Sequence, residues 1–169
     1  MIPDLSFTCG GACCTVSKIT VQQAKRYAEI MRKNGKQEIR AAMFYNLKIL
    51  QLFFGGSVEE IEQEDVRDVL TAAKAIHFVM QEIVLQKFAE LAPEAPPQGA
   101  SAFDDIDREE DEEAGVDPPD PWEITIENID AVVKMAIVVM HDSYTGVMNA
   151  ELVELLDHIA YEIKTANQK

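Results

Sequence analysis

Three cysteines near the N-terminus, Cys9, Cys13 and Cys14, are the residues best suited to chemistry. Thiolates bind zinc in tetrahedral sets, and a reactive thiolate can act as a nucleophile when a histidine base activates it. No histidine or fourth cysteine lies nearby in the sequence. We therefore interpret the group as two core cysteines and one surface thiol, and we expect no metal site.

The three histidines do not complete a catalytic or metal-binding motif. His77, His141 and His158 fall on separate predicted helices, and their spacing matches no motif such as His-Glu-x-x-His. Without a convergent set of polar residues, we expect no enzyme activity, no catalytic residue and no cofactor.

Two glycine pairs and one acidic run invite ligand-binding interpretations that their spacing does not support. Gly10-Gly11 and Gly55-Gly56 are too short to cradle a phosphate, and no Lys-Ser/Thr pair follows either one. The acidic run 104–113 lacks the glycine and the terminal glutamate spacing of an EF-hand loop. We interpret the glycine pairs as a turn and a helix stop.

Composition and charge narrow the functional class further. The chain has 169 residues, 47% of them apolar, and a net charge of −15. Such a charge disfavours binding to nucleic acids or anionic membranes, and no apolar run reaches the roughly 20 residues of a membrane span. Met1 to Leu5 show no signal-peptide pattern, and the odd cysteine count is unlike a secreted disulfide framework, so we expect a cytoplasmic protein.

Most of the negative charge lies in one segment, residues 92–121. It contains six prolines and eleven acidic residues against one basic residue, Arg108. Such a composition cannot bury enough apolar surface to offset its ordering entropy. We expect a disordered linker between a domain at residues 1–91 and a C-terminal module at residues 122–169.

The first element is a predicted β-hairpin over residues 5–16. Gly10-Gly11 supplies a two-residue turn. The resulting register pairs Cys9 with Ala12, Phe7 with Cys14, and Leu5 with Val16. Those six residues share one apolar face, whereas Cys13 points to the other face. An isolated hairpin is marginally stable, so we expect it to pack on the helices that follow.

Helices are predicted for most of the remaining N-terminal domain. Capping boxes at Thr20-x-x-Gln23 and Ser57-x-x-Glu60 mark two helix starts. The apolar spacing predicts helices over 20–34 and 37–54, a short turn through Ile61, and a long helix from Glu64 or Asp65 to Leu91. Val66 is expected to begin the apolar seam of the long helix.

The C-terminal module is predicted to be a helical hairpin. Its first helix follows Pro121, with a seam that ends at Met140, although the β-branched runs leave a strand open as an alternative. Residues 143–146 are expected to connect it to a last helix capped by Asn149. The predicted fold class is therefore mainly α, with a small β-hairpin packed on a helical domain.

A surplus of large apolar residues points to a protein-binding surface. Four of them lie off the main apolar stripes or at an exposed helix end: Phe44, Phe53, Phe78 and Leu85. Helices that are apolar over more than one stripe usually meet a partner or a second copy of the chain. We expect these four residues to contact a client protein, and we leave a homo-oligomer open.

In layout the chain resembles the tail assembly chaperones of long-tailed bacteriophages. The resemblance covers three stretches: the hairpin and helix start at 5–24, the turn 55–61 followed by Asp65-Val66-Arg67-Asp68-Val69-Leu70, and the acidic linker before a small C-terminal segment. It implies binding to the tape measure protein, whose apolar surface such chaperones shield. In many phages a frameshifted, extended form also recruits the major tail protein, and a two-part chain looks like that form.

Two other interpretations remain open at this level. The first is an acidic helical adaptor that regulates another protein. The second is a nucleic-acid mimic, although a mimic should present its carboxylates on rigid helix faces rather than in a linker.

Overall fold

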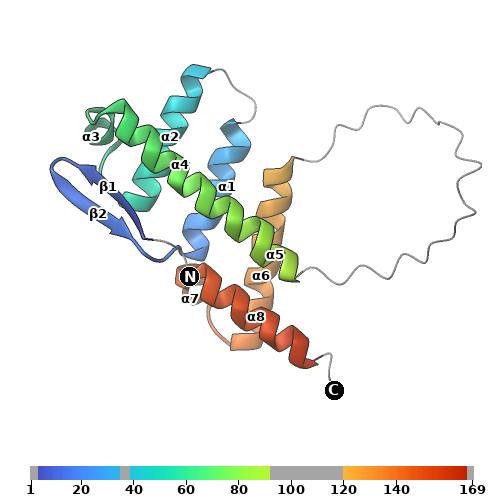
Figure 1. Cartoon of the computed structure of the whole chain (residues 1–169). Coiled ribbons are helices and arrows are strands. Elements are labelled where there is room, and N and C mark those ends of the chain that lie inside the picture. The colour runs from blue at the N-terminus through green and yellow to red at the C-terminus, as the bar shows by residue number, and fades with distance from the viewer. Residues whose placement is uncertain (1–3, 35–38, 92–119, 167–169) are drawn as a thin grey trace, which may run out of the picture.

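The computed structural model describes residues 4–34, 39–91 and 120–166, and it is mainly helical with one N-terminal β-hairpin (Figure 1). Its strands are β1 (Leu5–Cys9) and β2 (Ala12–Val16). Its helices are α1 (Val21–Asn34), α2 (Ile39–Phe54), α3 (Val58–Glu62), α4 (Val66–Glu82), the π-helical turn η1 (Ile83–Lys87), α5 (Phe88–Leu91), α6 (Pro121–Met140), α7 (Tyr144–Asn149) and α8 (Leu152–Ala166). The predicted fold class is confirmed, while 92–119, most of the predicted linker, lie outside the described residues.

The hairpin has the predicted register. It pairs Leu5 with Val16, Phe7 with Cys14, and Cys9 with Ala12, around glycines with φ angles of 58° and 78°. Leu5 and Phe7 are buried, but on β2 the same face is half-buried or exposed. Of the two strands, only β1 contributes fully buried side chains to the core, because it packs on α4. The expectation of two core cysteines is therefore corrected: Cys9 and Cys14 are half-buried, and Cys13 is exposed.

Both predicted capping boxes are present. The Gln23 N–H donates to Thr20 Oγ1 at 3.1 Å, and the Thr20 N–H donates to Gln23 Oε1 at 3.0 Å. Ser57 and Glu60 repeat this exchange at 3.2 and 2.9 Å. Gly55-Gly56 ends α2 with φ angles of 80° and 77°, which non-glycine residues rarely adopt. Sequence and local geometry therefore agree at three helix boundaries.

The long predicted helix spans the expected residues but contains a break in its hydrogen-bond pattern. Asp65 caps α4 by accepting from the Arg67 N–H at 2.7 Å. Much of the predicted seam is buried: Val69, Ala73, Ile76, Met80 and Ile83. Val66 is 56% exposed, because it begins the helix beyond the end of the packed stripe. The π-helical turn η1 then adds a residue to one turn, so the helix reaches Leu91 with a shifted face.

The C-terminal segment is helical, and the strand alternative for residues 126–140 is wrong. Asp120 caps α6 by accepting from the Trp122 N–H at 2.9 Å, and Pro121 occupies the first turn. The helix therefore begins within the predicted linker. Its buried face includes Ile129, as predicted, but the seam does not extend to Met140, which is 42% exposed.

The connection between the two long C-terminal helices differs from the prediction. Residues predicted as a connector begin the short helix α7, where Ser143 Oγ accepts from the Gly146 N–H at 3.1 Å. The last helix is not capped by Asn149. It begins at Leu152, and the Glu151 carboxylate accepts from the Glu154 N–H at 2.6 Å.

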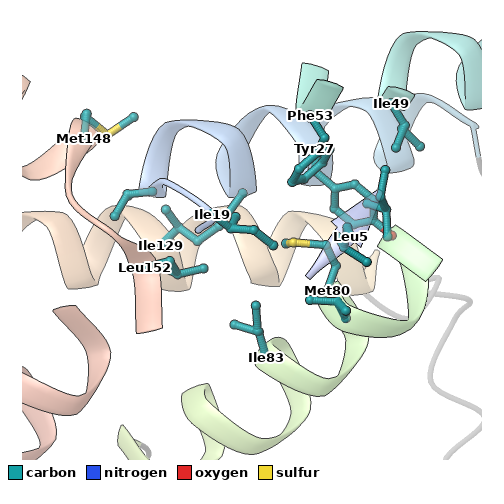
Figure 2. Close-up of a cluster of buried hydrophobic side chains, with 14 of the residues drawn as sticks. Leu5, Ile19, Tyr27, Ile49, Phe53, Met80, Ile83, Ile129, Met148 and Leu152 are labelled. Atoms are coloured by element: carbon teal, nitrogen blue, oxygen red, sulfur yellow. The ribbon is translucent and has the colours of Figure 1, made fainter. Parts of the chain in front are cut away.

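Residues 120–166 share one core with residues 4–91. Helices α6 and α7 pack on α1, while α8 packs on α5 and η1. The Leu152 N–H donates to the Ile19 carbonyl at 2.8 Å, joining the two parts through the backbone. Figure 2 shows Ile129 and Leu152 in the same apolar cluster as Ile19, Tyr27 and Met80. The C-terminal helices therefore complete the N-terminal core rather than form a second one.

Candidate protein-binding surface

A part-buried polar contact joins Tyr27 of α1 to His77 of α4. The Tyr27 side chain is 1% exposed, and its hydroxyl lies 2.7 Å from His77 Nδ1. His77 Nε2 lies 3.4 Å from Asn46 Oδ1, which can only accept, so Nε2 carries the proton and Tyr27 donates to Nδ1. Burial raises the pKa of Tyr27 above its usual range and lowers the pKa of His77. Both groups are therefore neutral at physiological pH. Through Tyr27, His77 and Asn46, these contacts link α1, α4 and α2.

The cysteines have no partners suited to metal binding in the part of the chain that the structure describes. Cys13 points away from Cys9 and Cys14, as the hairpin register requires. Burial, followed by the negative charges of Glu64 and Glu60, raises the pKa of the Cys9 thiol. The thiolate that would bind a metal or attack an electrophile is therefore disfavoured.

The four predicted contact residues have different environments. Phe44 and Phe78 are 47% and 62% exposed, which suits a contact surface. Phe53 is only 5% exposed, because its ring packs edge-on against Tyr27 at a centroid distance of 6.3 Å. The expected exposure of Phe53 is therefore wrong. Leu85 lies in η1, and its side chain is outside the described residues.

Phe44 and Phe78 do not share a surface. Asn46 of α2 faces α4, since it contacts His77. Phe44 lies two residues before Asn46, about 200° around the helix, so its ring points away from α4. Lys48 Nζ covers that ring at 4.4 Å from its centroid. The predicted residues thus give two separate exposed aromatic rings rather than one site.

Exposed apolar side chains instead gather along one face of α6. Four large residues repeat at helical spacing and are exposed by 37–70%: Ile124, Met135, Val138 and Val139. We call them the α6 stripe; between Ile124 and Met135 this face also carries Asn128 and Ala131, both exposed. At 1.5 Å per residue, the stripe runs for about 22 Å. Ile129, Val132 and Ala136, on the neighbouring face of α6, are buried in the core. The helix therefore has two apolar faces, of which one is buried and the other is exposed.

Charged residues border the stripe. Glu127 and Lys134 are exposed and seven residues apart, so they form a row along one side of it. An apolar strip with a polar rim is the usual anatomy of a protein contact surface. Sequence reasoning missed this surface, although the uninterrupted run 137–139 carries more apolar residues than one helix face can bury.

Surface clefts also occur in the described ranges. One, of about 470 Å³, lies between β1 and α4, and its lining includes Phe7, Phe54, Glu64 and Asp68. The other, of about 460 Å³, lies between α1 and α2. No helix in the described ranges is both long enough and apolar enough to cross a membrane.

Comparison with protein-family models, with curated proteins and with solved structures found no match to this chain. Its functional interpretation therefore depends on the residues themselves and on their arrangement.

Proposed function

We propose that this chain is a chaperone or adaptor that binds an apolar helical segment of a client protein through the α6 stripe. The observation that carries the proposal is an apolar stripe that remains open beside a fully packed helix face, with Val138 70% exposed. A client helix laid along four turns of α6 would bury these side chains, as amphipathic helices do in apolar grooves.

The energetics favour a client that offers many contacts. Burying a large apolar side chain contributes about 1.5–3 kcal/mol, and the stripe residues are already partly covered. Scaled by their exposed fractions, the four residues contribute roughly 3–6 kcal/mol, which lies at the lower end of association costs of about 4–15 kcal/mol. One copy would bind weakly, whereas several copies along a long client would hold it by avidity.

The resemblance to phage tail assembly chaperones supports a specific client. A tape measure protein is long and helical, and it needs its apolar surface shielded before the tail tube forms around it. The net charge of −15 would keep such an assembly soluble while the stripes are occupied. On this proposal the chain binds the tape measure protein and helps to recruit the major tail protein.

Co-expression with a candidate tape measure protein tests this function. The informative variant is Met135→Gln/Val138→Gln, because glutamine removes apolar surface while keeping good helix propensity. The wild-type chain should keep the client soluble, and this variant should not. Tyr161→Gln is the matched control, since Tyr161 is 64% exposed on a different helix, α8.

Two further readouts separate the alternatives. Circular dichroism must show that the double variant is folded, and sedimentation must show whether the free chain is a monomer. If the folded double variant solubilises the client as well as the wild type does, the α6 stripe is not the client surface. If the stripe instead holds a second copy of the chain, the variant will change the sedimentation coefficient without changing client solubility.

A further inference from the structure

The cleft between α1 and α2 concentrates positive charge in an acidic protein. Three cations line it, Arg26 and Lys33 from α1 and Lys48 from α2, against a single carboxylate, Glu29. Its inner surface includes the apolar residues Ile30 and Leu52. This combination of a basic edge and an apolar floor differs from the rest of a chain whose net charge is −15.

The cleft cations are unpaired within the described ranges. Other basic residues form ion pairs there, including Lys18 with Glu154 at 3.4 Å and Arg32 with Glu123 at 3.7 Å. None of the three cleft cations has such a pair with a described carboxylate. Their charges reinforce one another across the cleft and favour an anionic ligand.

We propose that this cleft binds a carboxylate-rich peptide segment, and that its occupant is the acidic segment of this chain, residues 104–113. Ten residues there carry eight carboxylates and one cation. The apolar residues Phe103 and Ile106 stand beside and among those carboxylates, so the segment matches both the charge and the apolar floor of the cleft. Several ion pairs between the segment and the cleft would then form a network, which stabilises binding more than a single exposed ion pair does.

The position of α6 brings the acidic segment within reach. Asp120 caps α6, and Glu123 in the next turn pairs with Arg32, the residue before Lys33 of the cleft. Residue 113 is seven positions before Asp120, and residue 104 is sixteen. At about 3.3 Å per extended residue, these positions can lie up to roughly 23 and 50 Å from the start of α6. The connection is therefore long enough for the segment to occupy the cleft of its own chain.

Zero-length carbodiimide cross-linking of the full chain tests the proposal, because it joins a lysine amine to a carboxylate that touches it. Peptide mass spectrometry should find Lys33 and Lys48 linked to residues 104–113. Lys74 and Lys164 are exposed lysines on other helices and serve as reference sites. We expect about five times more linkage at the two cleft lysines, and its loss at high salt.

Charge reversal supplies the matched pair of variants. Arg26→Glu leaves both cleft lysines in place but weakens the local field, so their linkage should fall about threefold. Arg67→Glu makes the same change at an exposed site on α4 and should leave the linkage unchanged. Isotope-labelled and unlabelled chains, mixed before cross-linking, should give linkages within single chains.

Three outcomes would overturn the proposal. The first is equal linkage of the cleft and reference lysines to residues 104–113. The second is that a twenty-nucleotide single strand binds in a manner that depends on Arg26, while the cleft lysines show no cross-link to residues 104–113. The ligand of the cleft would then be phosphate rather than carboxylate. Linkage that occurs only between labelled and unlabelled chains would contradict the stated occupant, since the segment would then come from a second copy.

Discussion

The shared core predicts that damage to the N-terminal helices will destabilise the C-terminal helices equally. Ile49 of α2 is 0% exposed and Leu156 of α8 is 1% exposed, so each alanine substitution removes a fully packed side chain. Ile→Ala and Leu→Ala at such sites cost about 2–5 kcal/mol, because the lost apolar transfer adds to the cavity left behind. With a urea dependence of about 2–3 kcal/mol per molar, a loss of about 3 kcal/mol lowers the midpoint by roughly 1–1.5 M.

Two probes read this effect in different parts of the chain. Circular dichroism reports all helices, whereas fluorescence reports Trp122, the single tryptophan, which packs on Tyr27 at a ring distance of 5.6 Å. For Ile49→Ala and for Leu156→Ala, both probes should give one transition with the same lowered midpoint. A circular dichroism curve that splits into two steps for Leu156→Ala, with one step at the wild-type midpoint, would refute the shared core.

Four other predictions follow from the structure and the sequence. Tyr27→Phe leaves His77 Nδ1 buried without its donor and should lower the free energy of unfolding by about 1–3 kcal/mol in urea titrations, whereas Tyr161→Phe should not. Because burial lowers the pKa of His77, the folded chain binds fewer protons there than the unfolded chain, so wild-type stability should fall as the pH drops below 6.5. The difference in the free energy of unfolding between wild type and His77→Gln should therefore change with pH, and a difference that stays constant across this range would contradict the prediction. Limited proteolysis should cut within residues 92–119, given their proline and acid content, yet the two fragments should co-elute because they share a core. Protein purified without chelators should contain less than one equivalent of zinc, and one tightly held equivalent that is lost on Cys9→Ser would contradict this.

Local patterns predicted much of the fold because their causes are local. The Gly10-Gly11 turn and the period-two alternation determine the hairpin register, since a slip of one residue would reverse its faces. The capping boxes at Thr20 and Ser57 require only contacts three residues apart. The helix at α6 was identified despite its β-branched residues, because its apolar spacing is helical.

The errors concern features that depend on distant segments. Phe53 is buried because Tyr27, 26 positions earlier in the chain, lies against it, and no local pattern records that contact. The start of α8 at Leu152 depends on a backbone hydrogen bond to Ile19. The α6 stripe was missed for the same reason, since only the packing of α6 on α1 decides which of its apolar faces is covered.

Site-specific photo-crosslinking tests the central proposal most directly. A photoreactive amino acid would replace Val138, Phe44, Phe78 or Tyr161 in turn, all of which are exposed, during co-expression with a candidate tape measure protein. The α6 stripe predicts a covalent adduct with the client from position 138 and none from position 161. Adducts from position 44 or 78 without one from 138 would place the client elsewhere, and the absence of adducts from all four positions would contradict client binding itself.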